Sequence, residues 1–533
     1  MQRKKFIKLS GLGILTTALS PTLTFCNLKP QKRGVQGAGR VNPDFNPDME
    51  VRLTSAPADI QLFTGAKTQV FTYHPALLKG DDFSLQTLQN SYLGPIIKVK
   101  QGQKVRVYYK NQLSDVSIIH WHGLHLPQEM DGHPMYVIDN GEEYVYEFQV
   151  NNRPGTYWFH PHPHGITGPQ VYGGLAGLFI VEDNERGLPS GEQDVPLVIQ
   201  DRTFNTDNQL VYLQNNRMAP MTGFLGNQIL INGRPDNSME VTRGTYRFRV
   251  LNGSNSRIYK LAWSDGEEVT VIGTDGGLLS RPIHKSYLML APGERAEIWR
   301  DFSEQNSGDE ISLISLSFNS GTAMGMMGGR GMGGGMMGGM GQSASVTENG
   351  DPFTLVAFKL LDREGEKQPL PESFSPVDTI DVDQAVNRDA PRQFNFHFQR
   401  MQWLINGQTF EMYEVADWEK VKLNTTEIWE FINGGSSGGM MGNMMSMPHP
   451  VHVHGLQFQI LERDVSDVPR SVWQTMGDGF VNEGWQDTFL LLPGMKVKVA
   501  LRFKDHTGKF IYHCHNLEHE DMGMMRNYEV INE

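Results

Sequence analysis

One of only two cysteines in the chain lies near the C-terminus between two histidines, in the run His513-Cys514-His515. Successive side chains of an extended strand point to opposite faces, so the sulfur of Cys514 should face away from both neighbouring imidazoles. His519 and Met524 follow a few residues later. Because a thiolate, imidazoles and a weakly bound methionine sulfur suit an electron-transferring copper, this run predicts a strand with a metal site on each face.

Seven more histidines occur in three clusters with the same alternate spacing. They are His120-Trp121-His122, His160-Pro161-His162 and His449-Pro450-Val451-His452-Val453-His454. In a strand, histidines two residues apart share a face and can offer ligands to neighbouring metals. A single pair of this kind is weak evidence, because most such histidines are ordinary core or surface residues. Here ten of the 17 histidines fall in four clusters, one of which contains a cysteine, and together they favour a site with several metal ions.

In order and spacing, the four clusters resemble the copper-binding motifs of the multicopper oxidases, the family that includes laccases, ascorbate oxidase and bacterial cuprous oxidases. The similarity runs from about Val51 to the C-terminus and includes the segments 94–99 and 484–488. It implies a copper-dependent oxidoreductase that takes single electrons from a substrate and reduces dioxygen to water with four electrons. It also implies four copper ions per chain, of which one is type 1, one is type 2 and two are type 3.

The resemblance assigns ligands to each copper. The type 1 copper takes His449, Cys514 and His519, with Met524 as the axial ligand. The type 2 copper takes His120 and His452. One type 3 copper takes His122, His160 and His515, and the other takes His162, His454 and His513. Every ligand position of the family pattern is therefore filled in this chain.

Two carboxylates beside these motifs match residues to which the family assigns proton delivery. Glu520 follows the ligand His519, and Asp131 lies eleven residues after His120. Reduction of dioxygen to water consumes protons, so a carboxylate next to the coppers can serve as their source. The alternative is that each carboxylate only orients a ligand imidazole.

Composition and periodicity predict an all-β chain. A hydrophobic content of 39% with 28 Pro and 57 Gly favours short strands and turns over long helices. The runs 104–108, 245–250 and 496–500 alternate polar and apolar residues, which is typical of half-buried strands in stacked antiparallel sheets. A length of 533 residues suggests roughly three or four domains.

The resemblance implies three cupredoxin-like Greek-key β-sandwich domains. Their expected limits are 45–183, 184–365 and 375–533, with a methionine- and glycine-rich loop at 321–342 in the second domain. Histidine clusters occur only in the first and third domains, so the three-copper cluster is expected at the interface of these two. The second domain is expected to act as a spacer, and His284 and His397 are expected to be ordinary histidines.

Residues 1–30 are typical of an export signal, because basic residues precede an uncharged, moderately apolar stretch from Leu9 to Phe25. The basic segment 3–8 resembles a twin-arginine signal in which lysine replaces the second arginine. We therefore expect a protein located in the periplasm or outside the cell, with no stable membrane span. We also expect a monomer. The formal net charge of −13 argues against nucleic-acid binding and suits a cationic substrate.

Two methionine clusters bear on the electron donor, one in a glycine-rich segment and one directly before His449. The expected substrate-binding residues are Met324, Met326, Met327, Met332, Met336, Met337, Met340, Met441, Met444, Met445 and Met447. Methionines of a core would be accompanied by leucine, isoleucine or valine at regular spacing, and flexible linkers use serine or proline. Thioether sulfur prefers Cu(I), so the clusters predict Cu(I) capture, as in the cuprous oxidases that give copper tolerance.

Other functions stay open. A broad-specificity laccase would oxidise phenols or amines, with the methionine loop only covering the pocket, and Fe(II) is another candidate donor. A non-catalytic cupredoxin scaffold or a copper store would not turn over at all. Such scaffolds have lost copper ligands, whereas this chain keeps the complete set. The predicted function is therefore Cu(I) oxidation with dioxygen as the acceptor.

Overall fold

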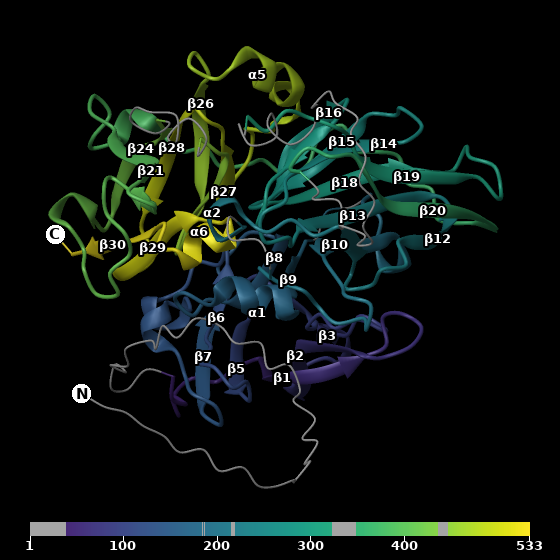
Figure 1. The fold of residues 1–533 in the computed structure, drawn as a ribbon, viewed down its shortest axis with the longest axis horizontal. Coiled ribbons are helices and arrows are strands. Elements are labelled where there is room, and N and C mark those ends of the chain that lie inside the picture. Colours follow the sequence, from purple (N-terminus) through teal and green to yellow (C-terminus); the bar gives the residue numbers. More distant parts are fainter. Residues whose placement is uncertain are drawn as a thin grey trace, which may run out of the picture. The chain divides into compact units, whose positions relative to one another are not determined.

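Strands dominate the structure and form six sheets, which pack in three pairs (Figure 1). The computed structural model describes residues 39–183, 185, 187–214, 219–321, 348–434 and 446–532. Each pair of sheets encloses its own hydrophobic core, and we call the pairs the first, second and third sandwich in chain order. The predicted all-β architecture is confirmed.

The first sandwich packs around a core that includes Val51, Val107 and Phe179. Its sheets have the strand orders β2-β1-β5-β7 and β3-β4-β9-β8-β6. The strands are β1 (Met49–Ile60), β2 (Thr68–Lys79), β3 (Leu85–Gln86), β4 (Ile96–Lys100), β5 (Lys104–Asn111), β6 (Ile119–His122), β7 (Glu143–Gln149), β8 (Gly155–Pro161) and β9 (Gly177–Glu182).

The second sandwich packs around a core that includes Phe248, Val271 and Phe358. Its sheets have the strand orders β11-β10-β13-β18-β15-β16 and β12-β20-β19-β14-β17. The strands are β10 (Asp194–Arg202), β11 (Gln228–Ile231), β12 (Ser238–Arg243), β13 (Thr245–Asn252), β14 (Tyr259–Trp263), β15 (Val269–Thr274), β16 (Gly277–Lys285), β17 (Leu288–Leu290), β18 (Arg295–Asp301), β19 (Glu310–Ser315) and β20 (Phe353–Glu364).

The third sandwich packs around a core that includes Phe431, Val499 and Cys514. Its sheets have the strand orders β22-β21-β24-β28-β26 and β23-β30-β29-β25-β27. The strands are β21 (Arg392–Gln399), β22 (Gln402–Ile405), β23 (Lys420–Lys422), β24 (Thr425–Asn433), β25 (His449–Val453), β26 (Phe458–Asp464), β27 (Thr488–Leu491), β28 (Lys496–Phe503), β29 (Gly508–Cys514) and β30 (Met525–Ile531).

Helices are short throughout the part of the chain that the structure describes. The α-helices among the described residues are α1 (Thr167–Gly173), α2 (Ala219–Thr222), α5 (Arg470–Met476) and α6 (Leu517–Asp521). The 3-10 turns are η1 (Asp82–Ser84), η2 (Gln128–Met130), η3 (Pro134–Tyr136), η4 (Gly191–Gln193), η5 (Val382–Gln384), η6 (Asp417–Glu419) and η7 (Gly477–Gly479). Across those described ranges, none of the helices has the length and apolar character needed to cross a bilayer.

The three alternating runs singled out in the sequence all form strands, as β5, β13 and β28. Two details differ from the prediction. Each sheet contains a parallel pair, such as β1 with β5 and β10 with β13. Strand β13 is buried along its whole length rather than on one face, because Arg247 and Arg249 form ion pairs with the buried Glu297. The strands lie within the expected domain limits, which themselves stay a prediction.

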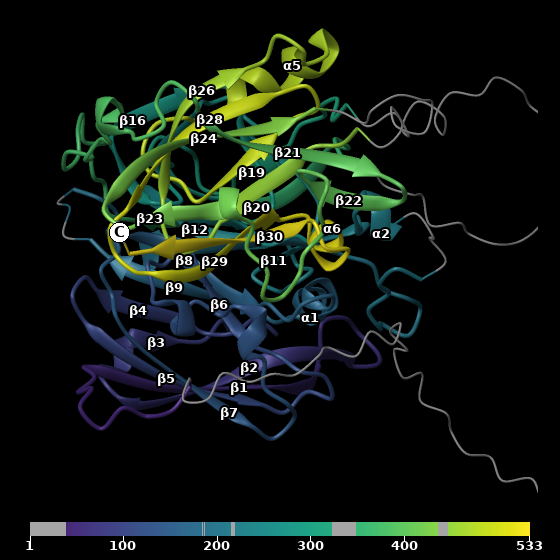
Figure 2. The same ribbon diagram turned by 90° about the vertical axis from the view of Figure 1, so that its left-hand side faces the viewer.

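Two antiparallel strand pairs carry the histidine clusters to one place. In the first sandwich β6 pairs with β8, so that His120 lies opposite His160. In the third sandwich β25 pairs with β29, so that His452 lies opposite His513. Figure 2 shows β29 lying next to β6 and β8. The imidazole of His120 stacks on that of His454 at a centroid distance of 3.7 Å, which places the two strand pairs in direct contact.

Candidate metal centres

Cys514, His449 and His519 converge at the end of β29 and form what we call the sulfur site. The Sγ atom of Cys514 lies 3.4 Å from Nδ1 of His449 and 3.6 Å from Nδ1 of His519. Burial lowers the pKa of His449 to about 3 and raises the pKa of the Cys514 thiol, so the metal-free groups are neutral. A soft cation that displaces the thiol proton fits this donor set.

Met524 is held beside the sulfur site by its main chain. Its N–H donates to the carbonyl oxygen of His519 at 2.9 Å, and its carbonyl oxygen accepts from the N–H of Cys514 at 3.0 Å. The side chain is fully buried in the core that contains Cys514. This position is compatible with the axial ligand implied by the resemblance, and that role stays a prediction.

A contact between the second and third sandwiches covers His519. The Nε2 atom of His519 donates to the carbonyl oxygen of Met221 in α2 at 3.1 Å. Trp403 in β22 donates from Nε1 to the same oxygen at 3.1 Å, and its ring lies 4.2 Å from the imidazole of His519. We call Trp403 and the Met221 carbonyl the cap. For Nε2 of His449, in contrast, the described residues provide no hydrogen-bond partner.

The remaining clustered histidines form a second centre, which we call the histidine cluster. Its members are His120, His122, His160, His162, His452, His454, His513 and His515, and each is at most 1% exposed. The Nε2 atoms of His120 and His452 are 3.3 Å apart, and those of His454 and His513 are 3.1 Å apart. The rings of His122, His160 and His515 lie 5.0 to 5.7 Å from one another. The histidines expected to bind the type 2 copper and the two type 3 coppers thus lie close together in the structure.

Hydrogen bonds at the opposite ring nitrogens explain why these close nitrogen pairs need a cation. The Nδ1 atoms of His120 and His452 each donate to a main-chain carbonyl oxygen at 2.7 Å, those of Asp131 and Asp487. Both Nε2 atoms therefore present lone pairs to each other, an arrangement that is repulsive unless a positive ion lies between them. A copper ion held by the two imidazoles would remove this repulsion.

Unpartnered nitrogens identify further ligand atoms. His122 donates from Nε2 to Oδ1 of Asp487 at 3.0 Å, which leaves its buried Nδ1 without a partner. His160 donates from Nδ1 to the carbonyl oxygen of Pro161 at 2.9 Å, which leaves Nε2 without one. Neither ring nitrogen of His515 has a partner. Buried polar atoms are normally satisfied, so these nitrogens fit metal ligands.

The two predicted proton carriers both contact the histidine cluster. Oδ2 of Asp131 lies 2.8 Å from Nδ1 of His454, and burial raises the pKa of this carboxyl well above its usual value. Oε2 of Glu520 lies 3.2 Å from Nδ1 of His513. Burial alone would raise the pKa of Glu520, but the neighbouring His162 and His513 outweigh it and lower the pKa. The two carboxyls thus differ in proton affinity, and their catalytic role stays a prediction.

Several residues of the site were not identified from the sequence. Asp487 and Thr488 contact His122 and His452. The segment 484–488 resembles the family in sequence, but no role was predicted for its residues. Arg295, which binds Asp487, lies in a strand without any motif. His284 bonds to Thr270, and His397 bonds to a main-chain carbonyl oxygen. That both are ordinary histidines stays a prediction.

Of the expected substrate methionines, Met447 is described and is 6% exposed. Its carbonyl oxygen accepts from Nδ2 of Asn433 at 2.7 Å, which fixes the chain just before His449. The other expected substrate residues, Met324, Met326, Met327, Met332, Met336, Met337, Met340, Met441, Met444 and Met445, lie outside the described residues. The same holds for the expected export signal at 1–30.

Comparison with known proteins gives matches along most of the chain. Two family models, each described as multicopper oxidase, match residues 71–186 and 383–533. The multicopper oxidase mco of Staphylococcus haemolyticus is 31% identical over 83% of this chain and 82% of its own length. A laccase of Bacillus subtilis is 29% identical over 82% of this chain and 88% of its own length.

The match extends to solved structures. The McoA multicopper oxidase of the hyperthermophile Aquifex aeolicus superposes with a TM-score of 0.72 and 31% sequence identity, covering 94% of this chain and 100% of that one. The likeness confirms the predicted fold of cupredoxin-like sandwiches.

Proposed function

This chain belongs to the multicopper oxidase family, and from that premise we propose that it oxidises Cu(I) in preference to organic donors and carries four copper ions. It is a copper-dependent oxidoreductase that uses dioxygen as the acceptor. Bound copper supplies the one-electron chemistry that the side chains lack and the reduction of dioxygen to water. The facing lone pairs of His120 and His452 are the observation that carries the proposed copper site.

The proposed ligand sets use residues that lie close together. His449, Cys514 and His519 would hold the type 1 ion, with Met524 beside them as a further ligand. His120 and His452 would hold the type 2 ion. One type 3 ion would be held by His122, His160 and His515, and the other by His162, His454 and His513. Each of these groups is buried, as a site that excludes water requires.

The chain connects the two centres through adjacent residues. Cys514 belongs to the sulfur site, while its neighbours His513 and His515 belong to the histidine cluster. An electron that leaves the sulfur therefore reaches either imidazole along the main chain of a single strand. Glu520 and Asp131 lie within hydrogen-bond distance of cluster imidazoles and are proposed to deliver the protons that water formation consumes.

Three observations support Cu(I) as the donor. The cap occupies the outer nitrogen of His519, so a bulky phenol does not reach that imidazole directly. His449 keeps its outer nitrogen without a partner among the described residues, and Met447 lies two residues before it. The net charge of −13 attracts cations. Export to the periplasm or cell exterior through residues 1–30 places the reaction where external copper arrives.

Oxygen uptake by the copper-loaded full chain tests the proposal, with Cu(I), Fe(II) and a phenol compared at equal concentration. We expect Cu(I) to give the fastest uptake and metal analysis to give four coppers per chain. Deletion of residues 324–340 should raise the apparent KM for Cu(I) and leave the copper content unchanged. Met447→Leu, which removes the sulfur at similar volume, should also raise this KM, whereas Met476→Leu on α5 serves as the control.

The results separate the alternatives. Faster uptake with the phenol than with Cu(I) would identify a laccase, a reading supported by the similarity to the laccase of Bacillus subtilis. Copper-loaded protein that takes up no oxygen with any donor would be a scaffold or a copper store. Fewer than four coppers in fully loaded protein would contradict the proposed ligand sets.

A further inference from the structure

Arg295 is a fully buried arginine of the second sandwich, and its guanidinium binds the carboxylate of Asp487 with two hydrogen bonds. Nη1 donates to Oδ1 at 2.7 Å and Nη2 donates to Oδ2 at 2.6 Å. This parallel, two-point geometry is the strongest that an arginine forms with a carboxylate. Asp487 belongs to the third sandwich, so the contact crosses the boundary between the two.

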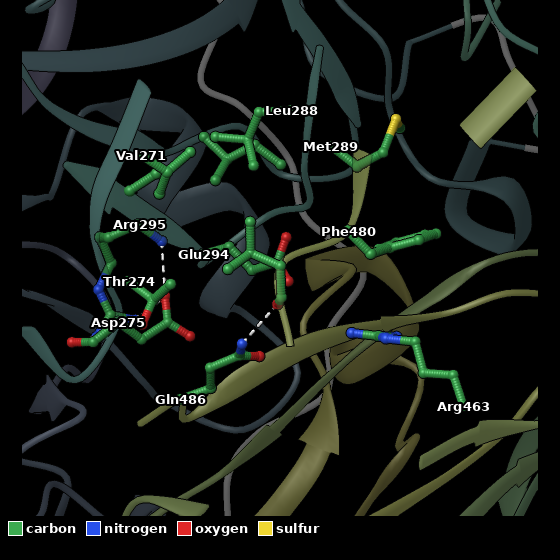
Figure 3. Close-up of a pocket in the computed structure, with 13 residues that line it drawn as sticks. Val271, Thr274, Asp275, Leu288, Met289, Glu294, Arg295, Arg463, Phe480 and Gln486 are labelled. Atoms are coloured by element: carbon green, nitrogen blue, oxygen red, sulfur yellow. Dashed lines mark hydrogen bonds and ion pairs between the residues drawn. The ribbon is translucent and has the colours of Figure 1, made fainter. Parts of the chain in front are cut away.

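The guanidinium is itself fixed from several sides. Nε donates to the carbonyl oxygen of Thr156 in β8 of the first sandwich at 3.0 Å. Nη1 and Nη2 donate to the carbonyl oxygens of Gly293 and Asp275 at 3.0 and 3.1 Å. Figure 3 shows Arg295 next to Asp275 at the wall of a cavity of about 30 Å³. One side chain of the second sandwich therefore contacts all three sandwiches.

Asp487 in turn contacts two of the proposed copper-ligand groups. Its Oδ1 atom accepts from Nε2 of His122 at 3.0 Å, and its main-chain carbonyl oxygen accepts from Nδ1 of His452 at 2.7 Å. The hydroxyl of Thr488 donates to the same Oδ1 atom at 3.0 Å. These bonds hold His122 with its proton on Nε2 and its Nδ1 free to bind copper.

Asp487 lies close enough to His122 and His452 to be taken for a metal ligand itself. Its hydrogen bonds argue against this, because both carboxylate oxygens already accept from Arg295 and one of them also from His122. An oxygen that is engaged in these bonds acts as support for an imidazole rather than as a metal donor.

The charge of Arg295 keeps this support in place. A buried carboxylate without a partner is costly, so its oxygen atoms need fixed donors. Burial alone would lower the pKa of the Arg295 guanidinium, but the charges of Asp275 and Asp487 outweigh it and raise the pKa. Arg295 therefore remains charged and donates to both oxygens of the Asp487 carboxylate.

The second sandwich approaches the cluster at one more point. Gly293, two residues before Arg295, has a φ of +86°, and a side chain there would lie 3.1 Å from the ring of His515 and 3.2 Å from that of His122. The backbone of this loop thus packs directly on two cluster imidazoles. This contact brings Arg295 within reach of Asp487.

We propose that Arg295 is a positioning residue for the dioxygen-reducing histidine cluster, acting through Asp487 on the orientation and tautomer of His122 and on the position of His452. The inference rests on the proposed ligand sets. It gives the second sandwich, which contributes none of the proposed ligands, a direct part in building the site. Loss of the guanidinium lets the neighbouring cavity extend to Asp487, so that water replaces a fixed two-point contact.

The test compares Arg295→Met with a matched control, Arg247→Met. Arg247 is also a buried arginine of the second sandwich and also binds a buried carboxylate, that of Glu297. Among the described residues, Arg247 forms no hydrogen bond or ion pair with a cluster histidine. Arg295→Met removes the arginine from Asp487, and Arg247→Met leaves Glu297 with Arg249 as its remaining arginine partner, so both variants should lower the unfolding midpoint. Only Arg295→Met should disturb copper in the histidine cluster.

Three measurements on copper-loaded full-length protein decide the outcome: copper content, the type 2 signal in electron paramagnetic resonance, and the colour of the sulfur site. Arg295→Met should weaken copper binding at the type 2 position roughly 10- to 100-fold and alter its signal. The colour of the sulfur site should stay. Arg247→Met should keep the full copper content and the wild-type signals.

Arg295→Lys keeps a positive charge but lacks the two-point fork, so an intermediate type 2 signal is expected, and this variant serves if Arg295→Met does not fold. A wild-type signal in Arg295→Lys and full copper in Arg295→Met would overturn the inference. Equal copper loss in Arg247→Met would reduce Arg295 to a general stabilising role and overturn it as well. Absence of a type 2 signal in the wild-type protein would instead refute the proposed function.

Discussion

The sulfur site and the histidine cluster are built in different ways, although they share the strand β29. The three side chains of the sulfur site all come from the third sandwich and lie between residues 449 and 519. The histidine cluster draws its imidazoles from two sandwiches and its supporting Arg295 from another. The sulfur site therefore depends on packing within one sandwich, whereas the cluster depends on how the sandwiches pack against one another.

Replacing the sulfur ligand is expected to have the largest effect and to separate the two centres. Cys514→Ser removes the thiolate, so the colour of the sulfur site should disappear and turnover with any donor should fall to background. The cluster imidazoles on the other face of β29 should still bind copper, because none of them uses the sulfur. Copper analysis and oxygen uptake measure both effects. Retained turnover would show that electrons enter without the sulfur site.

Removal of the proposed proton carriers should have the next largest effect, and it concerns the cluster alone. Glu520→Gln and Asp131→Asn keep the size of each side chain but remove its acid function, and turnover at saturating Cu(I) should fall roughly 10²- to 10⁴-fold. The sulfur-site colour and the KM for Cu(I) should stay near wild type. If copper content falls in parallel with turnover, the carboxylates orient imidazoles instead of carrying protons.

Sequence reasoning predicted a metal site at Cys514, His519 and Met524 because these residues lie close together in the chain, whereas His449 was added through the family resemblance. The alternation in His513-Cys514-His515 fixes which side chain faces which way, and the structure has this arrangement. The all-β fold also followed from local patterning, since β5, β13 and β28 form where the sequence alternates. The assignment of each histidine to one copper came from family likeness, not from spacing.

The support of the cluster could not be predicted because its contacts cross sandwiches. Arg295 and Asp487 are 192 residues apart in the chain, and no local pattern marks Arg295 as anything but a polar residue of a strand. The same reason hid the cap, where Trp403 meets the carbonyl oxygen of Met221 across another such boundary. The expectation that β13 is half-buried failed for a related reason, because buried ion pairs there replace solvent.

Opening the cap should have a smaller effect, confined to the sulfur site. Trp403→Ala removes the ring that lies against His519, so a phenol should gain roughly tenfold in kcat/KM, which corresponds to about 1.4 kcal/mol. Cu(I) oxidation and the copper content of the cluster should change little. Phe398→Ala is the control, because Phe398 packs on Trp403, whereas the rings of the described residues that contact His519 are those of Trp403 and His449. An unchanged preference between phenol and Cu(I) would mean that the cap does not select donors.

Acid should lower the folding stability of the metal-free protein by protonating histidines of the two centres. The turnover of the copper-loaded protein should not change directly near neutral pH. Burial lowers the pKa of His449 to about 3, of His160 to about 4 and of His162 to about 3, from an ordinary value of 6.5. At a pH between the lowered pKa of the folded protein and the ordinary pKa of about 6.5, the unfolded chain binds more protons than the folded chain. The stability of the metal-free protein therefore falls as the pH drops below about 6.5.

Each histidine that titrates in this window contributes a slope of about 1.4 kcal/mol per pH unit. Seven histidines of the histidine cluster have a lowered pKa, against two of the sulfur site, so the cluster should dominate the acid sensitivity. Unfolding midpoints in urea at several pH values measure this sensitivity. Bound copper blocks protonation of its ligands, so loaded protein should tolerate lower pH. His133 provides the internal reference, because its pKa is also lowered to about 3, by burial, but its Nε2 donates to Asn527 and does not depend on copper. If the unfolding midpoint falls equally with acid in the presence and absence of copper, the titrating groups lie outside both centres, at sites such as His133.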